Sequence, residues 1–278
     1  MFAHEFMRNA FLAGTFVALA CGLVGYYVVL RAQVFAGDAL SHVAFTGALA
    51  AAAAGIDLRI GLFAVTIIVA LGMGAAGDRA RADDAVIGSF FAWILGLGAL
   101  FLSIFTTSSS GSGDGTAGVR VLFGSIFGLS GSQARLAAAL GALAAIVVLA
   151  IARPLLFSSV DVEVAEARGL RVKLIGLVFL GVLGLVAAEA TQAVGALLLL
   201  GLLSAPAGAA LRLTANPYAG LGLSAALALL ATWGGLALSY LVPDLPPSSM
   251  IISLAVAIYV AAAALGREAT TPKLESVS

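Results

Sequence analysis

Apolar stretches about as long as a bilayer is thick recur along almost the whole chain. A helix needs about 20 apolar residues to cross the hydrocarbon core of a membrane. Lipid cannot satisfy exposed backbone polar groups, and the sequence lacks the alternation of barrel strands, so every stretch is predicted to be helical. The predicted fold is all-α, a polytopic transmembrane bundle of about nine spans, with eight as the alternative. The nine are Arg8–Leu30, Gly37–Gly55, Arg59–Gly77, Asp84–Phe105, Gln133–Ala152, Val172–Glu189, Val194–Arg212, Tyr218–Val242 and Pro247–Gly266.

Composition supports a membrane protein and excludes several other classes. Charged residues make up 10% of the chain, whereas soluble domains carry roughly 25%. The 14 basic and 14 acidic residues balance, so no strongly basic face indicates nucleic-acid binding. Cys21 is the single cysteine, which excludes an intrachain disulfide and a cysteine-based zinc cluster. We expect one transmembrane domain over residues 1–266, starting with a retained span, and a polar, disordered tail over residues 267–278.

The basic residues are distributed unevenly between the two sets of loops. Ten of the 14 fall on one set and four on the other. Because cytoplasmic loops carry an excess of Lys and Arg, the first set is predicted to be cytoplasmic, with the N-terminus outside and the C-terminus inside. The ten are Arg31, Arg79, Arg81, Arg153, Arg168, Arg171, Lys173, Arg212, Arg267 and Lys273, and the four are Arg8, Arg59, Arg120 and Arg135.

Two ionisable residues stand one helical turn apart in the second span. Asp38 and His42 lie in the string Gly-Asp-Ala-Leu-Ser-His, and a spacing of four places them on one helix face. An ionisable side chain inside lipid costs about 2.5–3.5 kcal/mol or more, so it indicates a function. A carboxylate and an imidazole can together bind a divalent transition metal. The alternative is that Asp38 caps the helix and His42 is merely hydrogen-bonded.

Two ligands alone hold a metal loosely. A symmetric homodimer would bring two Asp38 and two His42 side chains together at a two-fold axis.

A further carboxylate, Glu189, falls at the predicted outer end of the sixth span. We interpret it as an interfacial group, with a cation path as the alternative.

The loops contain three further features. Thr106–Gly118 is rich in Ser and Gly and is predicted to be a flexible outer loop, followed by a short re-entrant or interfacial helix within Val119–Leu129. The cytoplasmic segment Ser158–Leu170 has the punctuation of a short helix, with Ser159 or Asp161 as N-cap and Gly169 at the C-terminal end. Such a helix is either a docking element for a cytoplasmic partner or a solvated connection. The sequence contains no phosphate-binding loop, so the chain is not itself an ATPase.

Several motifs, in this order, resemble the membrane permease subunits of bacterial zinc, manganese and iron ABC importers, the ABC-3 family. The most specific is Gly37-Asp38-Ala39-Leu40-Ser41-His42. The others are Phe6-Met7-Arg8, Val28-Val29-Leu30-Arg31, Leu122-Phe123-Gly124-Ser125, Asp161-Val162-Glu163 with Ala165 and Gly169-Leu170, Val194-Gly195-Ala196-Leu197-Leu198, Ala205-Pro206-Ala207 and Pro247-Ser248-Ser249.

The resemblance implies a permease of the type II importer kind in the bacterial cytoplasmic membrane. It would pair with a second copy of itself and with cytoplasmic ATPase subunits that hydrolyse ATP, and an extracytoplasmic metal-binding protein would supply it. It would bind no resident cofactor, and the metal would be cargo. Asp38 and His42 would be the translocation-path ligands. The ATPase-coupling residues would be Glu163, Ala165, Glu166 and Gly169.

Three points stay open at this stage. The residues do not choose among zinc, manganese and iron. The Ser/Gly loop departs from the family pattern, which leaves docking of the binding protein on that side in doubt. Two rival functions are a proton-driven carrier acting through Asp38 and Glu189, and a permease for a metal chelate or cofactor, in which His42 would not bind metal.

Overall fold

Long apolar helices account for most of the chain in the computed structural model, which describes residues 4–77, 84–108, 124, 126–196, 199–242 and 244–268. Within these ranges there is no β-strand. The helices are α1 (Glu5–Leu30), α2 (Val34–Ala53), α3 (Leu58–Ala76), α4 (Asp84–Ser108), α6 (Gly131–Ala150), α7 (Ala152–Val160), α8 (Val162–Ala167), α9 (Val172–Ala193), α10 (Leu199–Leu213), α11 (Pro217–Leu241) and α12 (Pro247–Glu268), with a 3-10 turn, η2, at Ile126–Gly128.

The helix lengths confirm the all-α transmembrane bundle. Eight of the described helices are long and apolar enough to cross a membrane. The ninth apolar helix, α10, has 15 residues and so extends about 22 Å, less than the roughly 30 Å of a bilayer core. Residues 194–196 are not helical, and Gly195 has a φ of 102°. The predicted seventh span therefore starts later than Val194, because the backbone turns at this glycine.

Other predicted boundaries differ from the observed ones as well. Helix α2 starts at Val34, before the expected Gly37, and α9 continues beyond Glu189 to Ala193. Helix α4 continues into the predicted Ser/Gly loop as far as Ser108, and α12 continues to Glu268. The rest of that loop, most of the predicted interfacial helix in Val119–Leu129 and tail residues 269–278 lie outside the described residues.

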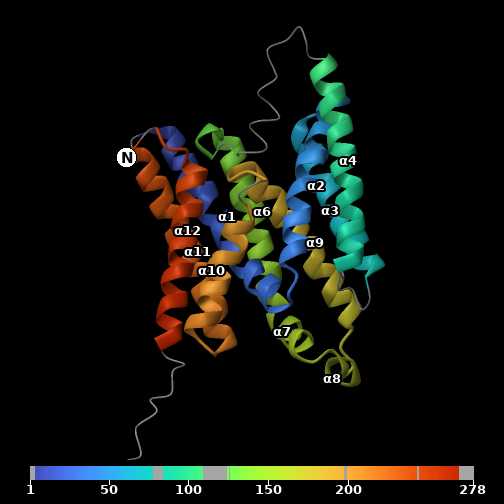
Figure 1. Cartoon of the computed structure of the whole chain (residues 1–278), viewed down its shortest axis with the longest axis vertical. Coiled ribbons are helices and arrows are strands. Elements are labelled where there is room, and N and C mark those ends of the chain that lie inside the picture. The colour runs from blue at the N-terminus through green and yellow to red at the C-terminus, as the bar shows by residue number, and fades with distance from the viewer. Residues whose placement is uncertain are drawn as a thin grey trace, which may run out of the picture.

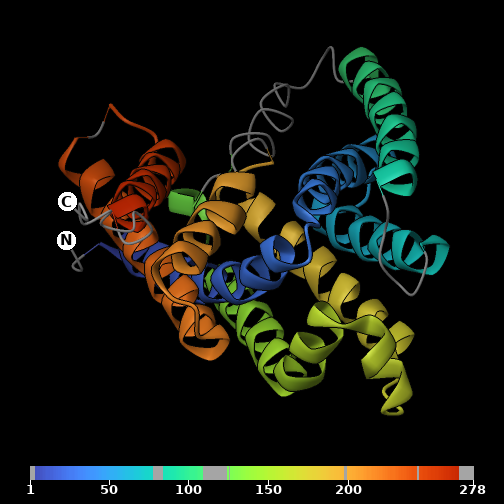
Figure 2. The same ribbon diagram turned by 60° about the horizontal axis from the view of Figure 1, so that its bottom comes forward.

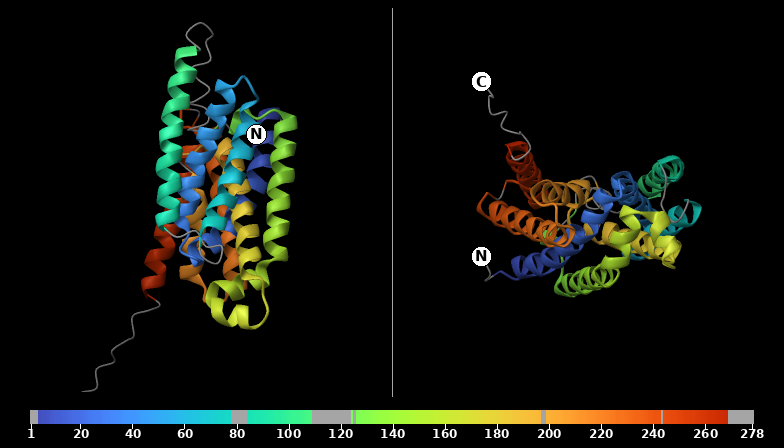
Figure 3. Two further views of the ribbon diagram at one scale, coloured as in Figure 1. Left: turned by 90° about the vertical axis from the view of Figure 1, so that its right-hand side faces the viewer. Right: turned by 90° about the horizontal axis from the view of Figure 1, so that it is seen from below.

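The bundle is elongated when viewed along its helices. Helix α1 lies in the middle and packs against α6, α9, α10 and α11, while α2 packs against α3, α4 and α9. Seen from below, α11 and α12 occupy one end of the outline and α3 and α4 the other (Figure 3, right). Figure 2 shows the same separation, with α1 running between the two groups. Helix α1 thus lies between a group formed by α10, α11 and α12 and a group formed by α2, α3, α4 and α9.

Close backbone approach and hydrogen bonds both hold α1 against its neighbours. A Cβ atom on Gly25 would overlap the backbone carbonyl of Leu203 in α10. Two buried hydrogen bonds link α1 to other helices, from Ser224 Oγ in α11 to the Gly22 carbonyl at 2.7 Å and from the Tyr27 hydroxyl to the Ala152 carbonyl in α7 at 3.0 Å. Interhelical hydrogen bonds in membranes contribute about 0.6 kcal/mol each on average, and small residues permit the tight packing that lipid does not otherwise drive.

The two ends of the bundle differ in charge as predicted. The lower end in Figure 1 carries the α1–α2 turn, α7, α8 and the final turns of α10 and α12, and the first turns of α1, α3 and α6 lie at the upper end. Described basic residues at the lower end are Arg31, Arg153, Arg168, Arg171, Lys173, Arg212 and Arg267, against Arg8, Arg59 and Arg135 at the upper end. The lower end is thus the predicted cytoplasmic end.

This orientation predicts the labelling of two exposed positions. In a Cys21→Ser background, Val160→Cys lies at the end of α7 and Ser132→Cys at the start of α6. A membrane-impermeant thiol reagent added to intact cells should label Ser132→Cys only, and Val160→Cys should react after permeabilisation. Labelling of both positions from the same side contradicts the orientation.

The packing at Gly25 predicts a large difference between two glycine substitutions. Gly25→Val forces α1 away from the α10 backbone and should destabilise the protein by about 1–3 kcal/mol or more, lowering the Tm by roughly 5 °C. Gly222→Val in α11 is the control, because Gly222 is exposed and has open space around it. Thermal unfolding of the purified variants in detergent measures both. Equal Tm values for the two variants would show that the α1–α10 contact is not tightly packed.

Candidate functional site

Four side chains form a single open stripe on the first half of α2. From Phe35 to Phe45 every residue of this helix is buried except Phe35, Asp38, His42 and Phe45. Their spacings of three, four and three residues place them on one helical face. Among the described elements, α4 covers part of this face through Phe91, and the part that stays exposed can line a path or meet a second chain.

Asp38 does not cap the helix. The N-cap of α2 is Gln33, and Asp38 is therefore in the second turn, where the first-turn N–H groups do not need its carboxylate. The hydroxyl of Ser41 donates to the backbone carbonyl of Asp38 at 2.7 Å. Ser41 therefore does not occupy the side-chain carboxylate of Asp38. The structure thus removes the capping explanation for Asp38.

The imidazole of His42 lies against an aromatic side chain of α4. Its ring meets Phe91 edge-on, with centroids 5.3 Å apart and an interplanar angle of 66°. Phe91 also meets Phe35 edge-on, at 5.7 Å. Thr46 ties the same two helices together by donating to the Ile94 carbonyl at 3.2 Å. Phe91 therefore restricts the orientation of the imidazole, and α4 has a fixed position against α2.

The pair lies in the half of its helix that is nearer the predicted cytoplasmic end. Asp38 and His42 are the fifth and ninth of the 20 residues of α2, so they stand about 6 and 12 Å from its lower end. Within the described ranges, no three His, Cys, Asp or Glu side chains lie close enough to share a metal ion. One chain therefore offers this pair as a partial coordination sphere only.

The predicted cytoplasmic helix is present as α8. Asp161, not Ser159, is its N-cap, and the carboxylate accepts the Val164 N–H at 2.9 Å. Gly169 has a φ of 82°, the left-handed conformation expected of a residue that ends a helix. Figure 1 shows α7 and α8 together at the lower end of the bundle.

Only part of the predicted coupling set is exposed. Glu163, Glu166 and Gly169 face outward, whereas Ala165 is completely buried. The buried methyl group anchors α8 against the rest of the protein, and the exposed residues form the surface that a partner can reach.

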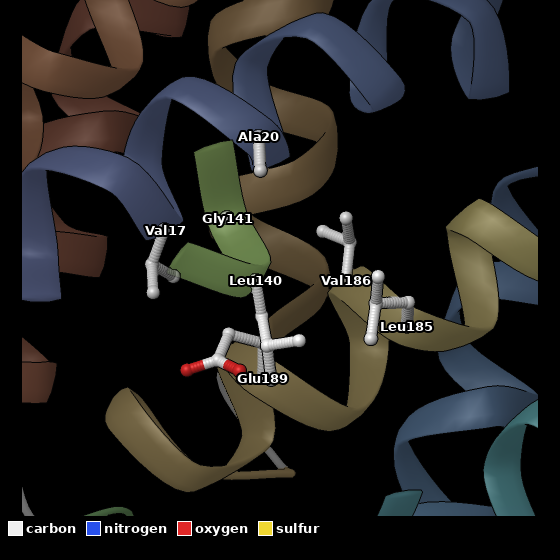
Figure 4. A pocket seen from close by; sticks show the side chains of 7 residues that line it. All are labelled: Val17, Ala20, Leu140, Gly141, Leu185, Val186 and Glu189. Carbon is white, nitrogen blue, oxygen red and sulfur yellow. The ribbon is translucent and has the colours of Figure 1, made fainter. Parts of the chain in front are cut away.

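The interfacial interpretation of Glu189 is wrong. Because α9 continues to Ala193, Glu189 lies inside a helix and is 3% exposed. It lines a narrow hollow between α1, α6 and α9 that has no space for a water molecule, and the other labelled lining residues are glycine and aliphatic side chains (Figure 4). Its Oε2 has no hydrogen-bond partner among the described residues. Solvation of Glu189 is prevented because side chains of α1 and α6 cover it, which the position of Glu189 in the sequence does not reveal.

Sequence reasoning also missed the aromatic neighbour and the corner before α2. Phe91 reads as one apolar residue in an apolar span, so nothing in the sequence pairs it with His42. Arg31 reads as a basic loop residue, but it is 4% exposed. The signal available in the sequence was the position of Arg31, a charged residue seven positions before Asp38.

Comparison with known proteins places the whole chain in one group. Residues 3–266 match the ABC 3 transport family. A manganese transport system membrane protein of Halalkalibacterium halodurans is 26% identical over 93% of this chain and 87% of its own length. A probable iron transport system membrane protein of Haemophilus influenzae is 29% identical over 95% of this chain and 94% of its own length.

A solved structure has the same fold. The structure titled PsaBC from Streptococcus pneumoniae in complex with Fab contains a chain that superposes with a TM-score of 0.79, at 24% identity, over 93% of this chain and 91% of that one. The family match, the similar fold and the eight long apolar helices lead to one conclusion. The chain is a multi-pass protein of the cytoplasmic membrane and belongs to the ABC 3 transport family.

Proposed function

We propose that the chain is the membrane-spanning subunit of an ATP-driven importer of a divalent transition metal, with manganese or iron as cargo. The observation that carries this proposal is the open stripe on α2, which presents Asp38 and His42 one turn apart in a segment, Phe35–Phe45, whose residues outside the stripe are all buried. Carboxylate and imidazole ligands suit Mn(II), Fe(II) and Zn(II) alike. The names of the relatives favour manganese and iron.

The functional unit is a homodimer. Asp38 and His42 supply two ligands from one chain, and no third group joins them among the described residues. A two-fold axis beside the open stripe would combine two such pairs into four ligands. Flexible sharing between subunits also suits a transport site, because the metal has to leave again. The ion is transported cargo and not a resident cofactor.

The energy comes from a separate cytoplasmic ATPase, since the sequence has no phosphate-binding loop. The capped helix α8, with Glu163, Glu166 and Gly169 exposed at the cytoplasmic end, is the docking element. An extracytoplasmic metal-binding protein delivers the ion to the opposite end. Rocking of the helices then alternates access around the Asp38 and His42 ligands.

Substitution of either ligand tests the cargo site. Asp38→Ala and His42→Ala should each reduce manganese uptake at limiting metal by on the order of 100-fold, since loss of even an outer-shell partner costs 10–100-fold in metal affinity. Ser41→Ala on the same helix is the control, because its hydroxyl bonds only to the local backbone among the contacts described. Uptake is measured in cells that lack other importers, with the amount of folded protein quantified. Near-normal uptake by either alanine variant would remove Asp38 and His42 from the path.

Substitution of Gly169 tests the docking element. Gly169→Val has space for its side chain but requires a β-branched residue at φ 82°, which costs about 1–2 kcal/mol and should shift the end of α8. Gly169→Asn is the matched control because Asn tolerates this conformation. We expect metal-stimulated ATP hydrolysis in vesicles to fall for valine and persist for asparagine.

Glu166→Lys tests the charge on α8. We expect it to lower the yield of co-purified ATPase, because the reversed charge would repel a complementary basic surface on the partner. Full coupling in Gly169→Val and Glu166→Lys together would mean that α8 is a solvated connection and that the ATPase docks elsewhere.

A further inference from the structure

The corner between α1 and α2 contains a buried cation. Arg31 is 4% exposed and its backbone N–H bonds to the Tyr27 carbonyl at 2.9 Å, which ends α1. The next residue, Ala32, has a φ of 55°, a conformation that is unfavourable for a residue with a Cβ atom. The chain therefore makes a tight, strained turn around a buried guanidinium group, a combination that a simple loop does not need.

Three elements converge on this guanidinium. Arg31 Nε donates to Gln33 Oε1 at 3.3 Å within the turn, and Nη1 donates to Ser159 Oγ in α7 at 3.5 Å. The group also lies 5.4 Å from the ring centroid of Phe179 in α9. One side chain thus contacts the start of α2, the end of α7 and α9.

The surrounding contacts reinforce this connection. Tyr27, one turn before Arg31, donates its hydroxyl to the Ala152 carbonyl at the start of α7, at 3.0 Å. The Tyr27 ring also meets Phe179 edge-on at 6.3 Å. Helix α8 joins α7 to α9 in the chain. The corner therefore contacts the two helices that flank α8, and a displacement of α8 reaches it through α7 and α9.

The corner is also the base of the metal-ligand helix. Gln33 is the N-cap of α2, and Asp38 follows five residues later on the same helix. A helix moves as a rigid element, so a shift of its N-cap shifts the ligands with it. One path from α8 to Asp38 therefore runs through Ser159 of α7 and Arg31.

The side-chain amide of Gln33 is only partly hydrogen-bonded among the described residues. Gln33 is 3% exposed, and its Nε2 has no hydrogen-bond partner among the described residues. The contact between Arg31 Nη1 and Ser159 Oγ, at 3.5 Å, is longer than the usual range of N–H···O hydrogen bonds, about 2.7–3.2 Å. A second conformation of the corner could give the Gln33 amide a hydrogen-bond partner and shorten the contact between Arg31 and Ser159, because buried polar groups are usually hydrogen-bonded.

We infer that Arg31 is a positioning residue that couples movement of α8 to movement of the Asp38 and His42 ligands, with Gln33 exchanging partners between the two states. This inference rests on the proposed function. A lysine would keep the charge but not the planar fork that reaches two acceptors and stacks on Phe179 at once, so the coupling depends on arginine itself.

The test uses the complete transporter, with its ATPase, in vesicles. The variants are Arg31→Lys, Ser159→Ala and Gln33→Met, and the control is Arg153→Lys, which changes an exposed arginine in α7. Manganese transported per ATP hydrolysed is measured per intact complex. If Arg31 had a purely structural role, its substitution would only reduce the amount of folded protein. The ratio of manganese transported to ATP hydrolysed does not depend on that amount.

We expect Arg31→Lys to lower the ratio about fivefold or more, in line with the size of coupling energies within proteins, while ATP hydrolysis continues and Arg153→Lys is unchanged. Ser159→Ala should lower it in the same direction, and the double variant Arg31→Lys/Ser159→Ala should be no worse than Arg31→Lys alone, because both changes remove one link.

An unchanged ratio in Arg31→Lys overturns the inference. If that variant fails to assemble, Ser159→Ala and Gln33→Met decide, and unchanged ratios in both overturn it too. Absence of metal transport by the unaltered complex would instead refute the proposed function.

Discussion

The cost of placing a polar group in lipid determines how this protein is built. Backbone groups are satisfied within helices, and side-chain charges are excluded from the apolar spans unless they have a purpose. Asp38, His42, Glu189 and Arg31 are four such side chains, and the structure places each of them buried or half-buried within or at the end of a described helix. Two of them share the open stripe on α2, one is enclosed between α1, α6 and α9, and one supports the corner that precedes α2.

The elements that could be predicted from the sequence are those whose signals are local. Apolar length located the spans, and the caps of α8 followed from Asp161 and Gly169, since capping depends on residues only a few positions apart. The one-turn spacing of Asp38 and His42 likewise defines a shared helix face. What could not be predicted depends on neighbours distant in the chain. The burial of Glu189 and the contact between Phe91 and His42 arise from packing of separate helices, and the apolar run through Gly195 looks continuous although the backbone turns there.

In the proposed function, the ligand geometry is separate from the energy input. The face of α2 that carries Asp38 and His42 is held by α3, α4 and α9, whereas the exposed surface of α8 lies at the lower end of the bundle, the predicted cytoplasmic end (Figure 1). A transporter needs these two regions to communicate without sharing residues, because a ligand that also bound the ATPase could not release its metal freely. At the corner, Arg31 contacts Gln33 at the start of α2 and also α7 and α9, the two helices that flank α8.

The central claim is that two chains complete one metal site, and the stoichiometry of bound metal tests it most directly. Purified complex without nucleotide is equilibrated with Mn(II), and bound ion is counted by electron paramagnetic resonance alongside the Asp38→Ala variant. The account predicts one bound ion for each pair of chains, with nitrogen ligands from two imidazoles, and none in the variant. One ion per chain, or binding that is unchanged in Asp38→Ala, would contradict it.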